Sequence, residues 1–208
     1  MKVIASVFLA ALALALVVAL WSWRLSAEPD DETPVEIAVA GVRLRVDPQL
    51  ARVRADLRHA ALEELDLVVT LPDLAPAGAK ANAMPMEKLV FMTLRRRDEK
   101  LEPRDKPARL YARFLEPLVE AHPAGLILRR FEAGGPYDLE TLYMTPPEGR
   151  VFWARCTPAG PAGATPATCL SEARIAGLDI RLRFSPDLLE EWEALSAGVL
   201  RLVEGMAR

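Results

Sequence analysis

An uncharged apolar run near the N-terminus constrains the fold first, because a segment of this length and polarity is suited to the interior of a bilayer. Within residues 3–23 only Ser6 and Ser22 are polar. At about 1.5 Å of rise per residue, about 20 such residues cross a hydrocarbon core of about 30 Å. We therefore predict an N-terminal transmembrane anchor over residues 1–25, which contacts the lipid bilayer through residues 3–23.

The charges that flank this run favour one orientation. Lys2 precedes it, and an acidic, proline-containing tether at residues 26–34 follows it, which favours a cytoplasmic N-terminus and a periplasmic C-terminal domain. The competing interpretation is a cleaved signal peptide, whose apolar region is usually about 7–15 residues long and precedes a small-x-small site. The run here is longer, and the segment Leu25–Ala27 has leucine where a small residue is preferred. Both interpretations export the remainder of the chain.

The exported part is acidic. Without residues 1–24, which contain Lys2 and Arg24, the chain has 24 basic and 29 acidic residues, a formal charge of −5. We therefore predict no nucleic-acid partner, because such binding depends on neutralising phosphate charge. Only five of the 26 basic residues in the whole chain are lysine, and this arginine-rich composition is typical of a GC-rich genome. Together with the compact anchor, it favours a single-pass protein of the bacterial inner membrane.

Two segments share the pattern of a β-hairpin that leads into a helix. In residues 35–46 the apolar positions alternate and change parity across Ala40-Gly41, which predicts a tight turn. Residues 174–192 can be aligned with residues 38–53, since both contain Ala-Gly, an alternating strand, a capping residue and a proline. The similarity indicates either a ββα internal repeat or a convergent local design, and the sequence leaves both open.

The remaining segments predict an antiparallel sheet with helices packed on it. Short apolar runs between Gly- and Pro-containing turns predict further strands. Helical signals occur in residues 48–57, 105–122 and 186–206. The apolar stripe of the last helix is shorter than the ~3–4 heptads of a coiled coil, so we expect it to pack on the sheet; it comprises Leu188, Trp192, Leu195, Val199, Leu202 and Met206. We expect one α+β domain over residues 35–208, with about three helices.

The chain lacks the motifs of the common catalytic and metal sites. It has no Gly-x-Ser-x-Gly, His-Glu-x-x-His or Cys-x-x-Cys sequence, and no phosphate-binding or dinucleotide-binding loop. Its two histidines, His59 and His122, have no neighbouring partner motif. Asp138 and Glu140 are the best candidates for a carboxylate pair, although a solvated strand face explains them as well. We predict no catalytic residue, no metal site and no cofactor.

Four arginines form the one candidate binding feature. Arg43 and Arg45 alternate with apolar residues in the first hairpin, as Arg181 and Arg183 do in the second. If the two strands were neighbours, their guanidinium groups would form a stripe for anionic lipid headgroups, an acidic partner or a glycan carboxylate. The alternative is an ordinary charged face that discourages association of strand edges.

The two cysteines, Cys156 and Cys169, predict a structural disulfide. Twelve residues separate them, which argues against a redox-active pair, and the histidines offer no supporting spacing for a metal site. In an oxidising envelope compartment a lone pair of cysteines usually forms a bridge. This bridge would join the ends of two strands around a loop of Thr, Pro, Ala and Gly.

These observations favour a membrane-anchored periplasmic protein that binds rather than catalyses. Its partner would be another envelope protein or an anionic ligand. Its role would be that of an accessory subunit, an assembly factor or a protein that neutralises a toxin by docking to it. The alternative is a small envelope enzyme or solute-binding module whose pocket residues are scattered in the sequence. The oligomeric state is left open.

Overall fold

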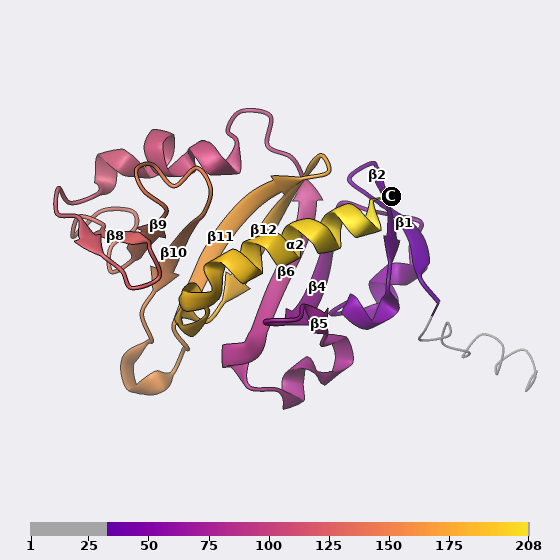
Figure 1. Cartoon of the computed structure of the whole chain (residues 1–208). Coiled ribbons are helices and arrows are strands. Elements are labelled where there is room, and N and C mark those ends of the chain that lie inside the picture. Colours follow the sequence, from indigo (N-terminus) through magenta and orange to yellow (C-terminus); the bar gives the residue numbers. More distant parts are fainter. Residues whose placement is uncertain (1–32, 208) are drawn as a thin grey trace, which may run out of the picture. The chain divides into compact units, whose positions relative to one another are not determined.

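The computed structural model describes residues 33–207, and its main feature is a nine-stranded antiparallel sheet (Figure 1). The strand order is β5-β4-β6-β12-β11-β10-β9-β8-β7. The bounds are β4 (Glu64–Thr70), β5 (Ala75–Pro76), β6 (Leu89–Arg96), β7 (Glu120–Ala121), β8 (Ile127–Arg130), β9 (Thr141–Met144), β10 (Trp153–Thr157), β11 (Thr168–Ile175) and β12 (Leu178–Phe184). A separate three-stranded sheet has the order β2-β1-β3 and consists of β1 (Val35–Val39), β2 (Val42–Val46) and β3 (Ala61–Leu62).

One α-helix occurs within residues 33–207, namely α2 (Trp192–Met206), which crosses one face of the large sheet (Figure 1). The other helical segments are short turns: η1 (Pro48–Leu50), η2 (Arg54–Arg58), η3 (Gly78–Ala83), η4 (Met86–Lys88), η5 (Pro103–Asp105), η6 (Pro107–Tyr111), η7 (Ala112–Phe114), η8 (Pro161–Gly163) and η9 (Pro186–Glu191). None of the helices in this described range combines the length and the apolar character needed to cross a bilayer. The anchor predicted for residues 3–23 lies outside the described residues.

The prediction of an α+β domain with about three helices is wrong, because the described chain is dominated by its two sheets. Near residue 48 the predicted helix cap does form, because the Asp47 carboxylate accepts a hydrogen bond from the N–H of Gln49. The helix nevertheless ends after one turn, since Ala51 pairs with Leu67 and Arg52 donates its N–H to Asp66. Pairing with β4 therefore outweighs helix propensity here.

The second predicted helix, over residues 105–122, is interrupted in the same way. Its first part forms a π-helical turn, η6, followed by the 3-10 turn η7. Leu115 then pairs with Phe131, and Glu116 donates its N–H to the carbonyl of Arg130 on β8. The chain is therefore extended before it reaches Pro117, the residue expected to disrupt the helix.

The two hairpins have matching turns but different surroundings. Ala40-Gly41 and Ala176-Gly177 both have two positive φ angles, 47° and 87° in the first and 50° and 83° in the second. This conformation suits a two-residue turn that follows the right-handed twist of the strands. However, β1–β2 belongs to the small sheet and leads into 3-10 turns, whereas β11–β12 belongs to the large sheet and leads into η9 and α2. The two units are therefore not equivalent ββα elements.

The apolar stripe of the last helix packs on the sheet, as predicted. Leu195, Val199 and Val203 of α2 are at most 1% exposed and belong to the main core. They pack with alternate residues of the central strands, among them Met92 of β6 and Ile180 of β12. This core stabilises the fold through burial of apolar surface, at about 25 cal/mol per Å².

The outer strands are covered by a separate aromatic cluster. Tyr111 of η6 makes edge-to-face contacts with Phe131, Tyr137 and Trp153, at centroid distances of 5.8, 5.2 and 5.5 Å. The indole N–H of Trp153 donates to the carbonyl of Pro103 at 2.9 Å. Burial raises the pKa of Tyr111 to about 12. The short helical segments that replace the second predicted helix thus cover β9 and β10.

The predicted disulfide between Cys156 and Cys169 is present. The two residues lie directly opposite each other on β10 and β11. The bond closes the loop of residues 157–168, which contains the helical turn η8. The bridge therefore joins two strands at the base of a loop whose residues are mostly exposed.

Replacing both cysteines by serine should lower the free energy of unfolding by about 3 kcal/mol, because the unfolded chain regains the entropy that a bridge of this span removes. Urea denaturation of the two proteins measures the difference. Wild-type protein treated with a reductant should behave like the double variant. Equal midpoints for oxidised wild type and variant would contradict a stabilising role.

Candidate binding groove

The central strands have a second face that α2 does not cover. Along a strand successive side chains point to opposite faces, and residues paired directly across strands point to the same face. Because Met92 packs in the core with α2, its neighbours Phe91 and Thr93 point to the second face. The ladder places Thr93 opposite Arg181 of β12 on one side and Asp66 of β4 on the other.

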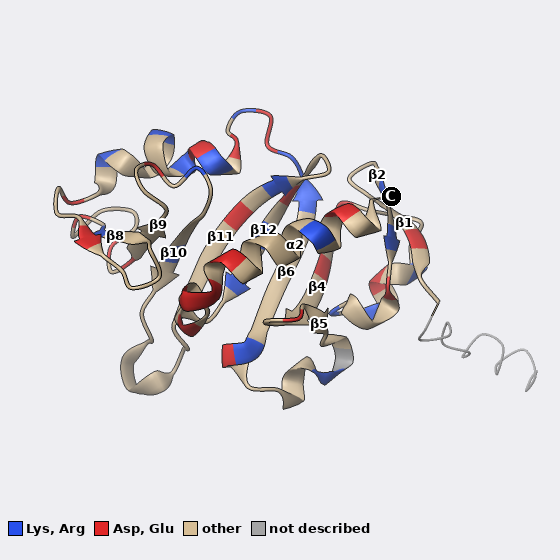
Figure 2. Ribbon diagram, in the orientation of Figure 1, with Lys and Arg blue, Asp and Glu red and all other residues tan. Residues whose placement is uncertain are grey.

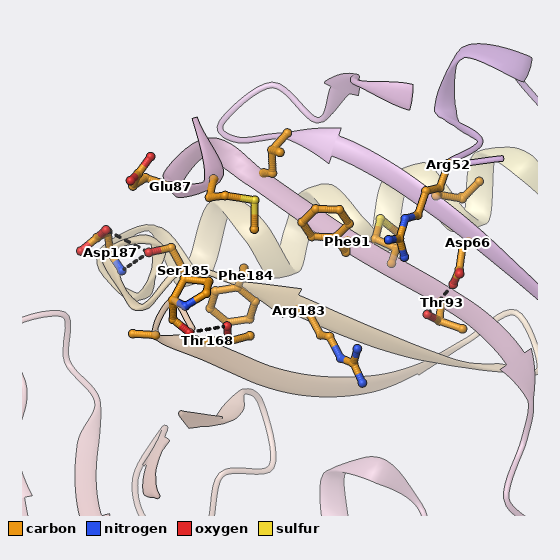
Figure 3. Close-up of a pocket in the computed structure, with 16 residues that line it drawn as sticks. Arg52, Asp66, Glu87, Phe91, Thr93, Thr168, Arg183, Phe184, Ser185 and Asp187 are labelled. Atoms are coloured by element: carbon orange, nitrogen blue, oxygen red, sulfur yellow. Dashed lines mark hydrogen bonds between the residues drawn. The ribbon is translucent and has the colours of Figure 1, made fainter. Parts of the chain in front are cut away.

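A groove of about 570 Å³ lies on this second face (Figure 3). The strands β4, β6 and β12 form its floor, and η4, the start of η9 and the residues that precede β11 form its walls. It is lined by Arg52, Asp66, Leu67, Met86, Glu87, Leu89, Phe91, Met92, Thr93, Pro166, Ala167, Thr168, Arg183, Phe184, Ser185 and Asp187. Segments from five separate parts of the sequence thus meet at one surface.

Arg52 and Phe91 give this groove a mixed character. The N–H of Arg52 donates to the carbonyl of Asp66 at 2.9 Å, which fixes Arg52 beside β4. Its guanidinium carbon lies 5.6 Å from the centroid of the Phe91 ring, within the range of a cation–π contact. Met86, 48% exposed, adds apolar surface on the η4 wall. The groove therefore presents a cation beside accessible apolar groups.

Two carboxylates in the groove have partners within the protein. The hydroxyl of Thr93 donates to Asp66 at 2.7 Å. The hydroxyl of Ser185 donates to Asp187 at 2.9 Å and accepts from the N–H of Asp187 at 3.4 Å, which caps η9. Both carboxylates therefore support local structure.

A buried carboxylate beside the groove holds three cations. The side chain of Glu172 on β11 is 5% exposed and forms ion pairs with Arg95 at 3.0 Å, with Arg181 at 3.5 Å and with Lys106. These partners come from β6, from β12 and from the segment between η5 and η6. Figure 2 shows this acidic position in the middle of β11 and basic positions at the end of β6. The cluster therefore connects strands that are far apart in the sequence.

A second buried carboxylate, Asp179, lies near the end of the same strands. It accepts hydrogen bonds from the Nε of Arg174 and from the N–H of Asp98, both at 2.7 Å. The hydrogen bond from Arg174 to Asp179 raises the pKa of the Arg174 guanidinium, which therefore stays charged. Like Glu172, this residue has a structural role on the sheet.

The catalytic candidates from the sequence lie outside the groove. His59 is exposed, and the Nδ1 of His122 accepts a hydrogen bond from the N–H of Ala124 at 3.3 Å. Glu140 forms an ion pair with Arg155; burial raises the pKa of Glu140, and Arg155 opposes this effect. Asp138 accepts from the N–H of Gly134 at 3.0 Å. The described residues contain no group of three or more His, Cys, Asp or Glu side chains placed to hold a metal ion.

The structure does not bring the four predicted arginines into one stripe. Arg43 and Arg45 lie on β2 of the small sheet, whereas Arg181 and Arg183 lie on β12 of the large sheet. Arg181 is paired with Glu172, and Arg183 lines the groove. Of the groove residues, Arg183 was a candidate from the sequence, whereas Arg52 and Phe91 were not. No spacing signal connects these two, because they meet only through the pairing of β4 with β6.

The fold has counterparts among solved structures, although no model of a known protein family and no curated protein sequence matches the chain. It is similar to Smlt3025, an immunity protein of the Stenotrophomonas maltophilia type IV secretion system, with a TM-score of 0.61 and 15% identity over 84% of this chain and 92% of that chain. It is also similar to FrpD, the iron-regulated outer membrane lipoprotein of Neisseria meningitidis, with a TM-score of 0.51 and 11% identity over 85% of this chain and 93% of that chain. At these identities the similarity establishes a shared fold.

Substitution Glu172→Gln should lower the free energy of unfolding by about 3 kcal/mol, because removing one partner of a buried ion pair leaves charge uncompensated. Urea denaturation measures the change. Glu63→Gln is the matched control. Glu63 also pairs with an arginine, Arg96, but its side chain is 79% exposed, and exposed ion pairs contribute little to stability. A Glu172 variant as stable as the Glu63 variant would show that the cluster contributes little.

Proposed function

We propose that this chain is an immunity protein of the bacterial envelope, which binds a toxin protein and neutralises it. The fold similarity to Smlt3025 carries the proposal, since it extends over 84% of the chain and Smlt3025 is an immunity protein of a secretion system. The anchor predicted for residues 1–25 would hold the domain at the inner membrane, with the domain in the periplasm.

Two further observations support an exported binding protein. The second structural counterpart, FrpD, is an outer membrane lipoprotein, and the disulfide suits an oxidising compartment. The groove is lined by arginine, aromatic, methionine and carboxylate side chains. Its serine, Ser185, caps η9. Arginine and aromatic residues are enriched where proteins contact one another.

The proposal is tested by deleting the gene in its native bacterium and growing the mutant in surface contact with its parent. We expect the parent to kill the mutant, because the mutant lacks protection against the toxin of its own lineage. The surviving fraction is measured by plating, and expression of the full chain in trans should restore survival. Equal survival of mutant and parent over a long contact period would contradict the proposal.

The same assay tests the proposed location. A chain whose residues 1–25 are replaced by a cleavable export signal should still protect, whereas a chain that simply lacks these residues should not, because it stays in the cytoplasm. Immunoblots of periplasmic and cytoplasmic fractions control for the amount of each protein. Full protection by the cytoplasmic form would overturn a periplasmic site of action.

A further inference from the structure

We propose that the groove over β4, β6 and β12 binds an extended segment of a protein partner, and that this segment presents a carboxylate beside a large apolar side chain. The identity of that partner as a toxin rests on the proposed function. The chemistry of the segment is inferred from the groove itself.

Among the described residues, the two arginines of the groove, Arg52 and Arg183, have no ion pair, although three carboxylates also line it. Six other arginines on strands of the large sheet each lie within 4 Å of a carboxylate oxygen, namely Arg95, Arg96, Arg130, Arg155, Arg174 and Arg181. Arg183 lines the groove and is exposed. Within residues 33–207 it forms no such ion pair. Arg52 contacts the ring of Phe91 rather than a carboxylate. The groove thus contains two guanidinium groups that a partner carboxylate would complement.

Apolar surface lies in the groove next to these cations. The half-buried Phe91 forms part of the floor, and Met86 is exposed on the η4 wall. An apolar side chain placed on them would exclude water from the neighbouring ion pair. Ion pairs at such partly desolvated sites contribute more to binding than those on an open surface. The groove therefore suits a segment in which the two kinds of side chain are adjacent.

The acidic residues of the groove determine where the carboxylate binds. Asp66, near the arginine end, accepts a hydrogen bond from Thr93, and Asp187 accepts one from Ser185; both carboxylates keep their charge. Glu87 is exposed and lies with Asp187 at one end of the groove (Figure 3). Arg52 lies towards the opposite end in the same view. A partner carboxylate is therefore repelled at the η4 end and attracted at the arginine end, which orients the segment.

The sheet topology determines how the segment is held. The three floor strands are interior strands, since β4 lies between β5 and β6, and β12 between β6 and β11. Their backbone groups pair within the sheet over the registered residues, so the floor offers no free strand edge for β-augmentation. Side chains must then provide recognition, and Arg52, Phe91 and Arg183 are the ones placed to do so.

The experiment uses the full chain in lipid nanodiscs to select from a random dodecapeptide library displayed on phage. We expect enrichment of a consensus with Asp or Glu next to a large apolar residue. A synthetic consensus peptide should bind at least tenfold more weakly to the Arg183→Glu and Arg52→Glu variants. Met86→Ser should also weaken it. The Arg43→Glu and Arg45→Glu variants are matched controls, because they reverse exposed charges on the small sheet, and should bind within twofold of wild type.

Equal urea midpoints for all charge variants establish that any loss of binding comes from the groove. Absence of a consensus, a consensus without an acidic residue, or peptide binding unaffected by Arg183→Glu overturns the inference.

The contact assay separates this inference from the proposed function. If the wild-type chain protects and the Arg183→Glu and Arg52→Glu variants protect equally well, the groove inference fails while the immunity function stands. If the wild-type chain does not protect but the peptide results are as expected, the immunity function fails and the groove inference stands.

Discussion

The contact between α2 and the central strands sets the arrangement of the remaining structure. Leu195, Val199 and Val203 bury one face of the sheet beneath a single helix. A sheet formed by nine strands has a second face of equal extent, and the described residues provide no second α-helix to cover it. On the second face, η3 packs over Val68 of β4 and Leu89 of β6, and three further features occupy the rest. An aromatic cluster covers the outer strands, a network of buried ion pairs spans β11, β12 and β6, and the groove remains open beyond it.

This division explains why charged residues lie within an apolar fold. Glu172 and Asp179 are buried on strands whose opposite side is part of the core. Glu172 is paired with Arg95, Arg181 and Lys106, and Asp179 with Arg174, so both charges are compensated. A buried charge of this kind is costly when left alone and tolerable when paired. The network therefore connects β6, β11 and β12 on this face.

The sequence predicted the local features of the fold better than its architecture. The Ala40-Gly41 turn, the apolar stripe of α2 and the bridge between Cys156 and Cys169 all depend on residues within one hairpin, helix or loop. The helices expected near residues 48 and 105 did not form beyond short turns, because Arg52 and Glu116 pair with distant strands. The groove was unpredictable for the same reason. Its residues converge only through the register of β4, β6 and β12, and no periodicity within a single segment records that register.

The disulfide has a consequence for the groove as well as for the hairpin. Ala167 and Thr168, which line one wall, immediately precede Cys169. The loop that leads to this wall contains mainly small residues and is largely exposed, and the bridge is a covalent attachment at its base, next to the paired residues Thr157 and Thr168. A chain that has not yet been oxidised lacks this attachment. The bridge between β10 and β11 therefore also fixes the base of the loop that supplies one wall of the groove.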